Sequence, residues 1–227
     1  FGALSNWKEV LDFFSKKYRV IIPLIPIFEM NILKLSVDGL AEFIRDFIAY
    51  KKLENVNLLG NSLGGHIALV FLKKYPQFVH SLLLTGSSGL YESAFGAEYP
   101  KKGDKKWIEE RVRVTFYDPK VVTEELVEEV YTTLQDRGKI LRILTMAKSA
   151  IRHNMKKDLP NFTLPTCLIW GLQDVITPPN VAEEFHQLMP NSELHFLDHC
   201  GHAAMMERPE EFNTLADDFF SRIRIKK

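Results

Sequence analysis

Apolar positions in the first third of the chain follow two spacings, one typical of helices and the other of strands. Apolar side chains recur every three or four residues over 7–14 and 36–50, which predicts two amphipathic helices. Short apolar runs predict strands at 18–24, 55–60 and 81–85. Because strands that alternate with helices form parallel sheets through right-handed crossovers, the pattern predicts an α/β fold with a mostly parallel, doubly wound sheet.

This alternation stops after Gly86 and resumes near residue 163. The intervening stretch is charged and helical in pattern, with helices predicted at 104–116, 122–135 and 137–152. Beyond it, the pattern predicts strands at 166–170 and 193–197 and helices at 181–189 and 209–225.

The order of elements predicts one core domain with an insertion. We assign residues 1–86 and 163–227 to an α/β core and residues 87–162 to a helical cap inserted between two strands. Open α/β sheets bind ligands at their carboxyl edge, and a helical insertion at this place would cover that edge. The alternative is a helical excursion that only covers apolar surface.

The composition of the chain limits the classes of function that we expect for it. Lys and Arg total 29 and Asp and Glu total 29, so the formal charge is zero and neither nucleic acid nor an anionic membrane is the expected partner. Cys167 and Cys200 make no disulfide framework, and the sequence around them shows no metal-ligand spacing, so a cytoplasmic protein without a metal is expected. The longest apolar run, 20–28, is too short to span a bilayer and is broken by two prolines.

A G-x-S-x-G motif at residues 60–64 lies between the strand at 55–60 and an apolar helix predicted at 63–75. A serine at such a sharp strand-to-helix turn is held in a strained backbone with its hydroxyl exposed, which is the arrangement of a nucleophile. Ser62 is therefore the predicted nucleophile. The alternative is an ordinary loop in which Ser62 caps the helix.

A serine nucleophile needs a base and an orienting acid within hydrogen-bond reach. Asp174 follows the strand at 166–170 and His202 follows the strand at 193–197, so both would reach the same sheet edge as Ser62. The chain order Ser62, Asp174, His202 is nucleophile, acid, base.

Other candidates lie close to these two. His199 competes with His202, and Asp198 competes with Asp174. Because Gly201 gives the loop freedom beside His202, and because Asp198 shares the histidine loop, we favour His202 and Asp174. Cys200 is expected to be a small buried filler.

Together these motifs resemble the α/β-hydrolase superfamily. The resemblance covers nearly the whole chain and rests on segments 60–65, 170–174, 200–202 and 207–212. It implies a mostly parallel eight-stranded sheet with a helical cap after the sixth strand, and no metal or organic cofactor. Asn61-Ser62 and Cys200-Gly201-His202 look like the branch that holds carboxylesterases and meta-cleavage-product C–C hydrolases.

Three residues qualify this resemblance. The C–C hydrolases usually carry tryptophan directly after the histidine, where this chain has Ala203. A serine at the elbow argues against the epoxide-hydrolase and haloalkane-dehalogenase branches. Arg152 stands where such hydrolases could keep an arginine for a substrate carboxylate, although a solvated helix charge is the more common role for such a residue.

The resemblance also implies an oxyanion hole formed by the backbone N–H groups of Leu63 and Phe1. Phe1-Gly2 look like the tail of a His-Gly-Phe-Gly loop, and the strands that precede this loop in the family are missing from the given sequence. Either the sequence is part of a longer chain or the protein is truncated.

The expected function is a serine hydrolase of a small, partly hydrophobic carboxylic ester that acts through an acyl-enzyme. A C–C hydrolase and a non-catalytic small-molecule receptor on the same fold stay open. Met205 and Met206 could contribute apolar surface to the substrate site, or could be plain core. The expected partner is a small acyl substrate, and a homodimer stays open.

Overall fold

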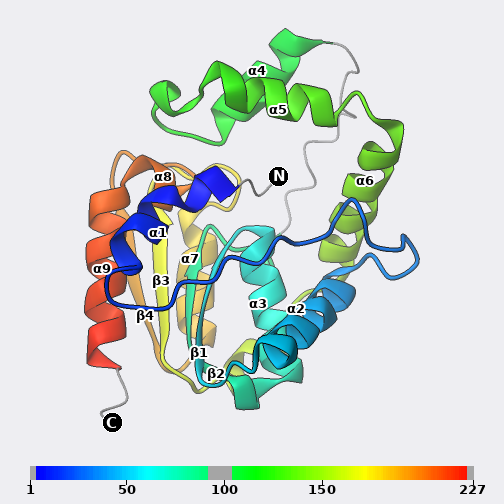
Figure 1. Ribbon diagram of the computed structural model, residues 1–227. Coiled ribbons are helices and arrows are strands. Elements are labelled where there is room, and N and C mark those ends of the chain that lie inside the picture. Colours follow the sequence, from blue (N-terminus) through cyan, green and yellow to red (C-terminus); the bar gives the residue numbers. More distant parts are fainter. Residues whose placement is uncertain (1–3, 92–103, 224–227) are drawn as a thin grey trace.

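The computed structural model describes residues 4–91 and 104–223 and shows one parallel sheet between two layers of helices (Figure 1). Its four strands are β1 (Val56–Asn61), β2 (Val79–Thr85), β3 (Thr166–Gly171) and β4 (Ser192–Leu197). They lie in the order β1-β2-β3-β4, and each pairs in parallel with the next. This confirms the α/β fold with a mostly parallel sheet.

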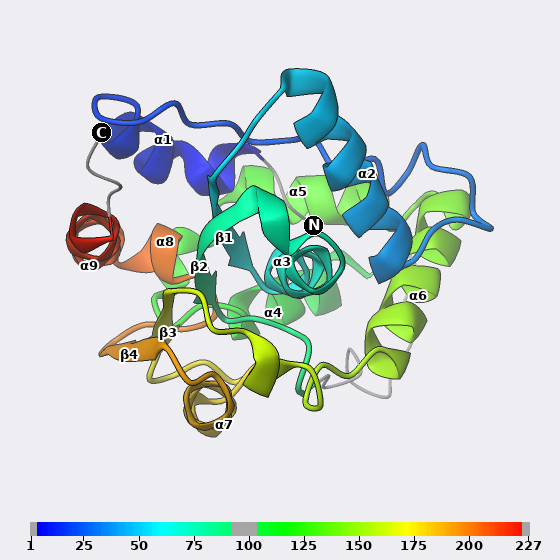
Figure 2. The same cartoon turned by 90° about the horizontal axis from the view of Figure 1, so that it is seen from below.

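Helices cover both faces of the sheet (Figure 2). One face carries α2 (Val37–Lys51), α3 (Leu63–Lys74) and α7 (Pro179–Leu188). The other face carries α1 (Lys8–Phe14), α8 (Ala204–Glu207) and α9 (Pro209–Arg222). Short 3-10 turns occur at Leu4–Trp7, Pro76–Phe78, Pro119–Val121 and Leu159–Asn161.

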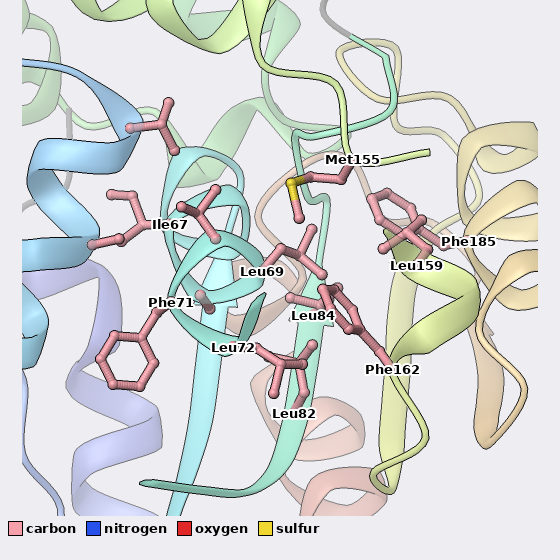
Figure 3. Packing of buried hydrophobic residues seen from close by; sticks show 14 of the residues in the cluster. Ile67, Leu69, Phe71, Leu72, Leu82, Leu84, Met155, Leu159, Phe162 and Phe185 are labelled. Carbon is pink, nitrogen blue, oxygen red and sulfur yellow. The ribbon is translucent and has the colours of Figure 1, made fainter. Parts of the chain in front are cut away.

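The central strands are mostly apolar because they are buried on both faces. In β2, Leu82 and Leu84 point into the core beneath α3 (Figure 3). Leu83, between them, belongs to the core beneath α9. In β3, Leu168 belongs to the core beneath α3 and Cys167 to the core beneath α9. This packing fixes the register of the strands and thereby the positions of the loops at their carboxyl ends.

Between β2 and β3, the described residues form three α-helices, as the sequence predicts: α4 (Lys105–Val114), α5 (Glu124–Thr133) and α6 (Arg137–Arg152). Figure 1 shows α4 and α5 above the carboxyl ends of the strands. The third helix, α6, lies beside α2, where the N–H of Val37 donates to Ser149 Oγ at 3.0 Å. No helix within the described residues combines the length and the apolar character needed to cross a bilayer.

The strand predicted at 18–24 is wrong, since this tract has no regular secondary structure. Val20 packs against the core beneath α9, but Leu24 is 69% exposed. A strand exists only where a neighbour satisfies its backbone groups, and within residues 4–91 and 104–223 β1 pairs with β2 alone. The resemblance implies eight strands, but the described part of the chain forms only four.

Candidate functional site

Ser62 occupies a strained turn between β1 and α3. Its φ of 52° and ψ of −121° lie in a region that non-glycine residues rarely adopt. Two loop contacts hold the turn: the N–H of Ser62 donates to Thr85 O at 3.2 Å, and the N–H of Ser88 donates to Ser62 O at 3.1 Å. The Ser62 side chain makes no cap hydrogen bond to α3, so the alternative role as a helix cap is not adopted.

Gly60 allows the chain to fold back this tightly. A Cβ at Gly60 would lie 2.6 Å from the backbone nitrogen of Gly65, closer than real Cβ contacts. Any side chain there would push α3 away from β1 and move Ser62. The glycine at position 60 therefore has a steric cause, whereas a Cβ at Gly64 would meet no atom within 4 Å.

Asp174 and His202 form a buried pair at the carboxyl ends of β3 and β4. His202 Nδ1 lies 2.9 Å from Asp174 Oδ2, and the two residues are only 7% and 2% exposed. The other carboxylate oxygen, Oδ1, accepts the N–H groups of Ile176 and Thr177 at 2.8 and 2.9 Å. These bonds fix the carboxylate, and the carboxylate in turn orients the imidazole.

Thr177 completes this environment. Its hydroxyl donates to Asp174 Oδ2 at 2.8 Å and lies 3.3 Å from His202 Nδ1. The sequence offered no signal for this role, because a threonine in a loop is common and its rotamer is set only by the fold.

The Ser62 turn lies against the His202 loop. Asn61 Nδ2 donates to the carbonyl oxygens of Thr85 and His202 at 3.0 and 3.1 Å. A Cβ at Gly86 would lie 2.8 Å from His202 Nδ1, so only glycine lets the loop after β2 pass the imidazole. The ends of the four strands in the described residues thus lie at one edge of the sheet, where the Ser62 turn contacts the loop that carries His202.

The remaining predicted site residues are Leu63, Phe1 and Arg152. Leu63 is the first residue of α3, where backbone N–H groups have no partner within the helix, as an oxyanion donor requires. Phe1 lies outside the described residues. Arg152 ends α6 with an exposed side chain, and no hydrogen bond or ion pair joins it to Ser62, Asp174 or His202 in the described parts of the chain.

The competing residues lie in other environments. His199 and Asp198 pair with each other at 3.2 Å on the surface, with side chains 60% and 61% exposed.

Burial raises the pKa of the Cys200 thiol to about 12, so the thiol stays protonated and is a weak nucleophile. Met205 is buried in the core beneath α9, which is its plain packing role.

Glu207, at the end of α8, connects the His202 loop to the helical insertion. Its carboxylate accepts the N–H groups of Gly201, Tyr117 and Asp118 at 2.8, 2.7 and 3.0 Å. Burial raises the pKa of Glu207, while these three N–H groups oppose the rise. Beside it, the N–H of His202 donates to Thr115 O at 2.9 Å. The sequence did not reveal this role, because Tyr117 and Asp118 are distant along the chain.

A second histidine lies one helical turn beyond Ser62. His66 Nε2 is 3.3 Å from His153 Nδ1, and the His66 side chain is fully buried. Burial, with a smaller effect of His153, lowers the pKa of His66 to about 4. His66 is therefore neutral in the folded protein at neutral pH.

The chain is similar to known proteins over most of its length. Residues 29–209 match the family described as serine aminopeptidase, S33. A solved α/β-hydrolase enzyme from the metagenome of sediments from the lagoon of Mar Chica is 45% identical, with a TM-score of 0.80, over 99% of this chain and 88% of that one.

Two curated relatives are enzymes. A 2-hydroxy-6-oxononadienedioate/2-hydroxy-6-oxononatrienedioate hydrolase of Pseudomonas sp is 28% identical over 235 residues, covering 96% of this chain and 83% of the relative. A monoacylglycerol lipase of Bos taurus is 26% identical over 241 residues, covering 96% and 72%. With the extent of the family match and the shared fold, the chain belongs to the serine aminopeptidase S33 family of α/β hydrolases.

Proposed function

We propose that this protein is a serine hydrolase that cleaves small, partly hydrophobic carboxylic esters through an acyl-enzyme. The buried hydrogen bond between His202 Nδ1 and Asp174 Oδ2 (2.9 Å), beside the strained turn at Ser62, carries the proposal. Imidazole and carboxylate groups are rarely buried together without a task that needs an oriented base.

Each residue has a defined role in this reaction. With Nδ1–H donated to Asp174, the lone pair of His202 is on Nε2, which takes the Ser62 hydroxyl proton as the oxygen attacks the ester carbonyl. The Leu63 N–H stabilises the oxyanion, and His202 then protonates the leaving alcohol. Water attacks the acyl-enzyme by the same route, which releases the acid and restores Ser62.

The helical insertion supplies the other wall of the substrate site in this proposal. We assign residues 87–162 to a cap over a core of residues 1–86 and 163–227. The support is the position of α4 and α5 above the strand ends and the bond from the His202 N–H to Thr115 O. The acyl group would lie between Ser62 and these helices.

A second candidate is hydrolysis of a C–C bond in a meta-cleavage product. Curated relatives with 26–28% identity include both a hydrolase of that class and a monoacylglycerol lipase. Ala203 after His202 favours the ester, because the C–C hydrolases usually place tryptophan there. Loss of the absorbance of a 2-hydroxy-6-oxo-dienoate, compared with release of p-nitrophenol from acyl esters, separates the two reactions.

Labelling with a fluorophosphonate probe tests the nucleophile directly. We expect one labelled residue, Ser62, and a loss of p-nitrophenyl acetate turnover of roughly a thousand-fold or more in Ser62→Ala. Ser221→Ala, an exposed serine on α9, is the matched control and keeps both signals. An unlabelled, folded wild-type protein, or equal turnover in Ser62→Ala, would favour a receptor with a vestigial site.

A further inference from the structure

Three metal-binding side chains lie together on the sheet, away from Ser62. They are Cys167 on β3 and Glu193 and His195 on β4, and one ligand atom of each lies within 4.8 Å of the others. Cys167 stands opposite Glu193 in the strand register. Glu193 and His195 are two residues apart on one strand, so both side chains are on the same face as the Cys167 thiol.

This arrangement suits the geometry of a metal site. Two ligands at alternate positions of one strand and a third directly across on the next strand converge on one point above the sheet. Ligands around tetrahedral zinc, at about 2.0–2.3 Å from the ion, stand roughly 3.5 Å apart. Because the Glu193 and His195 side chains are 29% and 34% exposed, rotation of these two can close the remaining distance onto the buried Cys167.

The donor set also has a chemical preference. A thiolate, an imidazole and a carboxylate are the ligand types that zinc takes, whereas magnesium and calcium take oxygen alone. His195 also lines an open groove between β4 and α9, so solvent has access to this ligand. The sequence shows no ligand spacing around Cys167, because its partners come from another strand.

Arg222 competes with a metal ion for the Glu193 carboxylate. Its guanidinium donates to both oxygens of Glu193, at 2.7 and 2.8 Å. Arg222 Nε also lies 3.0 Å from Asp218 Oδ2, so Arg222 keeps an acidic partner when Glu193 turns away. The Arg222 side chain is 50% exposed, so solvent weakens this pair, and a metal ion that takes Glu193 must displace it.

We propose that Cys167, Glu193 and His195 bind one zinc ion, with water as the fourth ligand. The Glu193–Arg222 ion pair is then the metal-free state. A zinc–sulfur bond replaces the S–H bond, and the thiol proton is released to solvent. Cys167 is near the start of β3, roughly 13 Å along the strand from Gly171, where the loop to Asp174 begins. The ion would therefore join β3 to β4 and take no part in ester hydrolysis.

Titration of the whole chain with Co²⁺, as a coloured substitute for Zn²⁺, tests the site. We expect one Co²⁺ per chain with a sulfur-to-cobalt charge-transfer band and strong tetrahedral visible bands, both removed when Zn²⁺ is added. Cys167→Ser abolishes the charge-transfer band, whereas Cys200→Ser, the matched control at the other buried cysteine, retains it. His195→Gln weakens binding at least roughly tenfold, and His186→Gln, an exposed histidine on α7, does not.

Other results would overturn the proposal. They are no cobalt–sulfur band in wild type, a band that survives Cys167→Ser, or equal affinities in His195→Gln and His186→Gln. If Cys167→Ser does not fold, the half-buried His195 decides the matter, because its replacement disturbs no core. Ser62→Ala binds cobalt like wild type, so failure of this proposal is separate from failure of the hydrolase proposal.

Discussion

At the residue scale, the site depends on how well Asp174 is held. Thr177 supplies both a hydroxyl and a backbone N–H to this carboxylate. We expect Thr177→Val to lower kcat for p-nitrophenyl acetate about three- to tenfold with KM unchanged, because one hydrogen bond that positions Asp174 is lost, worth ~1 kcal/mol. Thr177→Ser keeps the hydroxyl and should keep the rate. Equal kcat in Thr177→Val and wild type would contradict a positioning role.

Short motifs single out individual residues in the sequence. Ser62 has its own turn signature, and the structure places the predicted Asp174 and His202 in one buried pair. Thr177 and Glu207 could not be predicted, because their roles depend on which loops the fold brings together. The cluster around Cys167 could not be predicted for the same reason, because Glu193 and His195 are its neighbours across the sheet rather than along the chain.

At the scale of elements, one carboxylate joins the insertion to the core. We expect Glu207→Gln to lower the free energy of unfolding by about 1–3 kcal/mol and to lower kcat, because an amide cannot accept all three N–H groups. Urea unfolding and ester turnover measure the two effects. Glu210→Gln, an exposed carboxylate on α9, is the matched control. Identical stability in the two variants would show that the Glu207 contacts are dispensable.

Helices were predictable because their apolar spacing is a property of the segment itself. The observed bounds of α4, α5 and α6 differ from the expected ranges by only a few residues. The tract at 18–24 shows the limit of the same reasoning for strands. Its β-branched and apolar residues suit a strand, but strand formation also needs a neighbour, and sequence composition does not supply one.

At the scale of the whole molecule, the buried His66 makes stability depend on pH. The unfolded chain binds a proton at this histidine near pH 6.5, but the folded chain binds it only near pH 4. The unfolded state therefore holds more protons between these values, and stability falls as the pH is lowered through this window. Above about pH 6.5 both states are neutral at His66, and this penalty disappears.

We expect the free energy of unfolding to fall by roughly 2–3 kcal/mol between about pH 7 and pH 4.5 through His66 alone. Urea unfolding at the two pH values measures the difference. His66→Gln should show a smaller pH dependence than wild type, whereas the exposed His186→Gln should not. The same dependence in all three proteins would assign the acid sensitivity to other groups.

The hydrogen bond from the N–H of His202 to Thr115 O links movement of α4 and α5 to the position of the imidazole. If α4 and α5 swing aside to admit a bulky molecule, either this bond breaks or the imidazole is carried along with the helices. In the second case the imidazole is out of alignment while the helices are apart, whereas in the first case Asp174 still holds it in place. Where the imidazole moves with the helices, turnover is confined to the closed arrangement, and the rate of closure sets an upper limit on kcat.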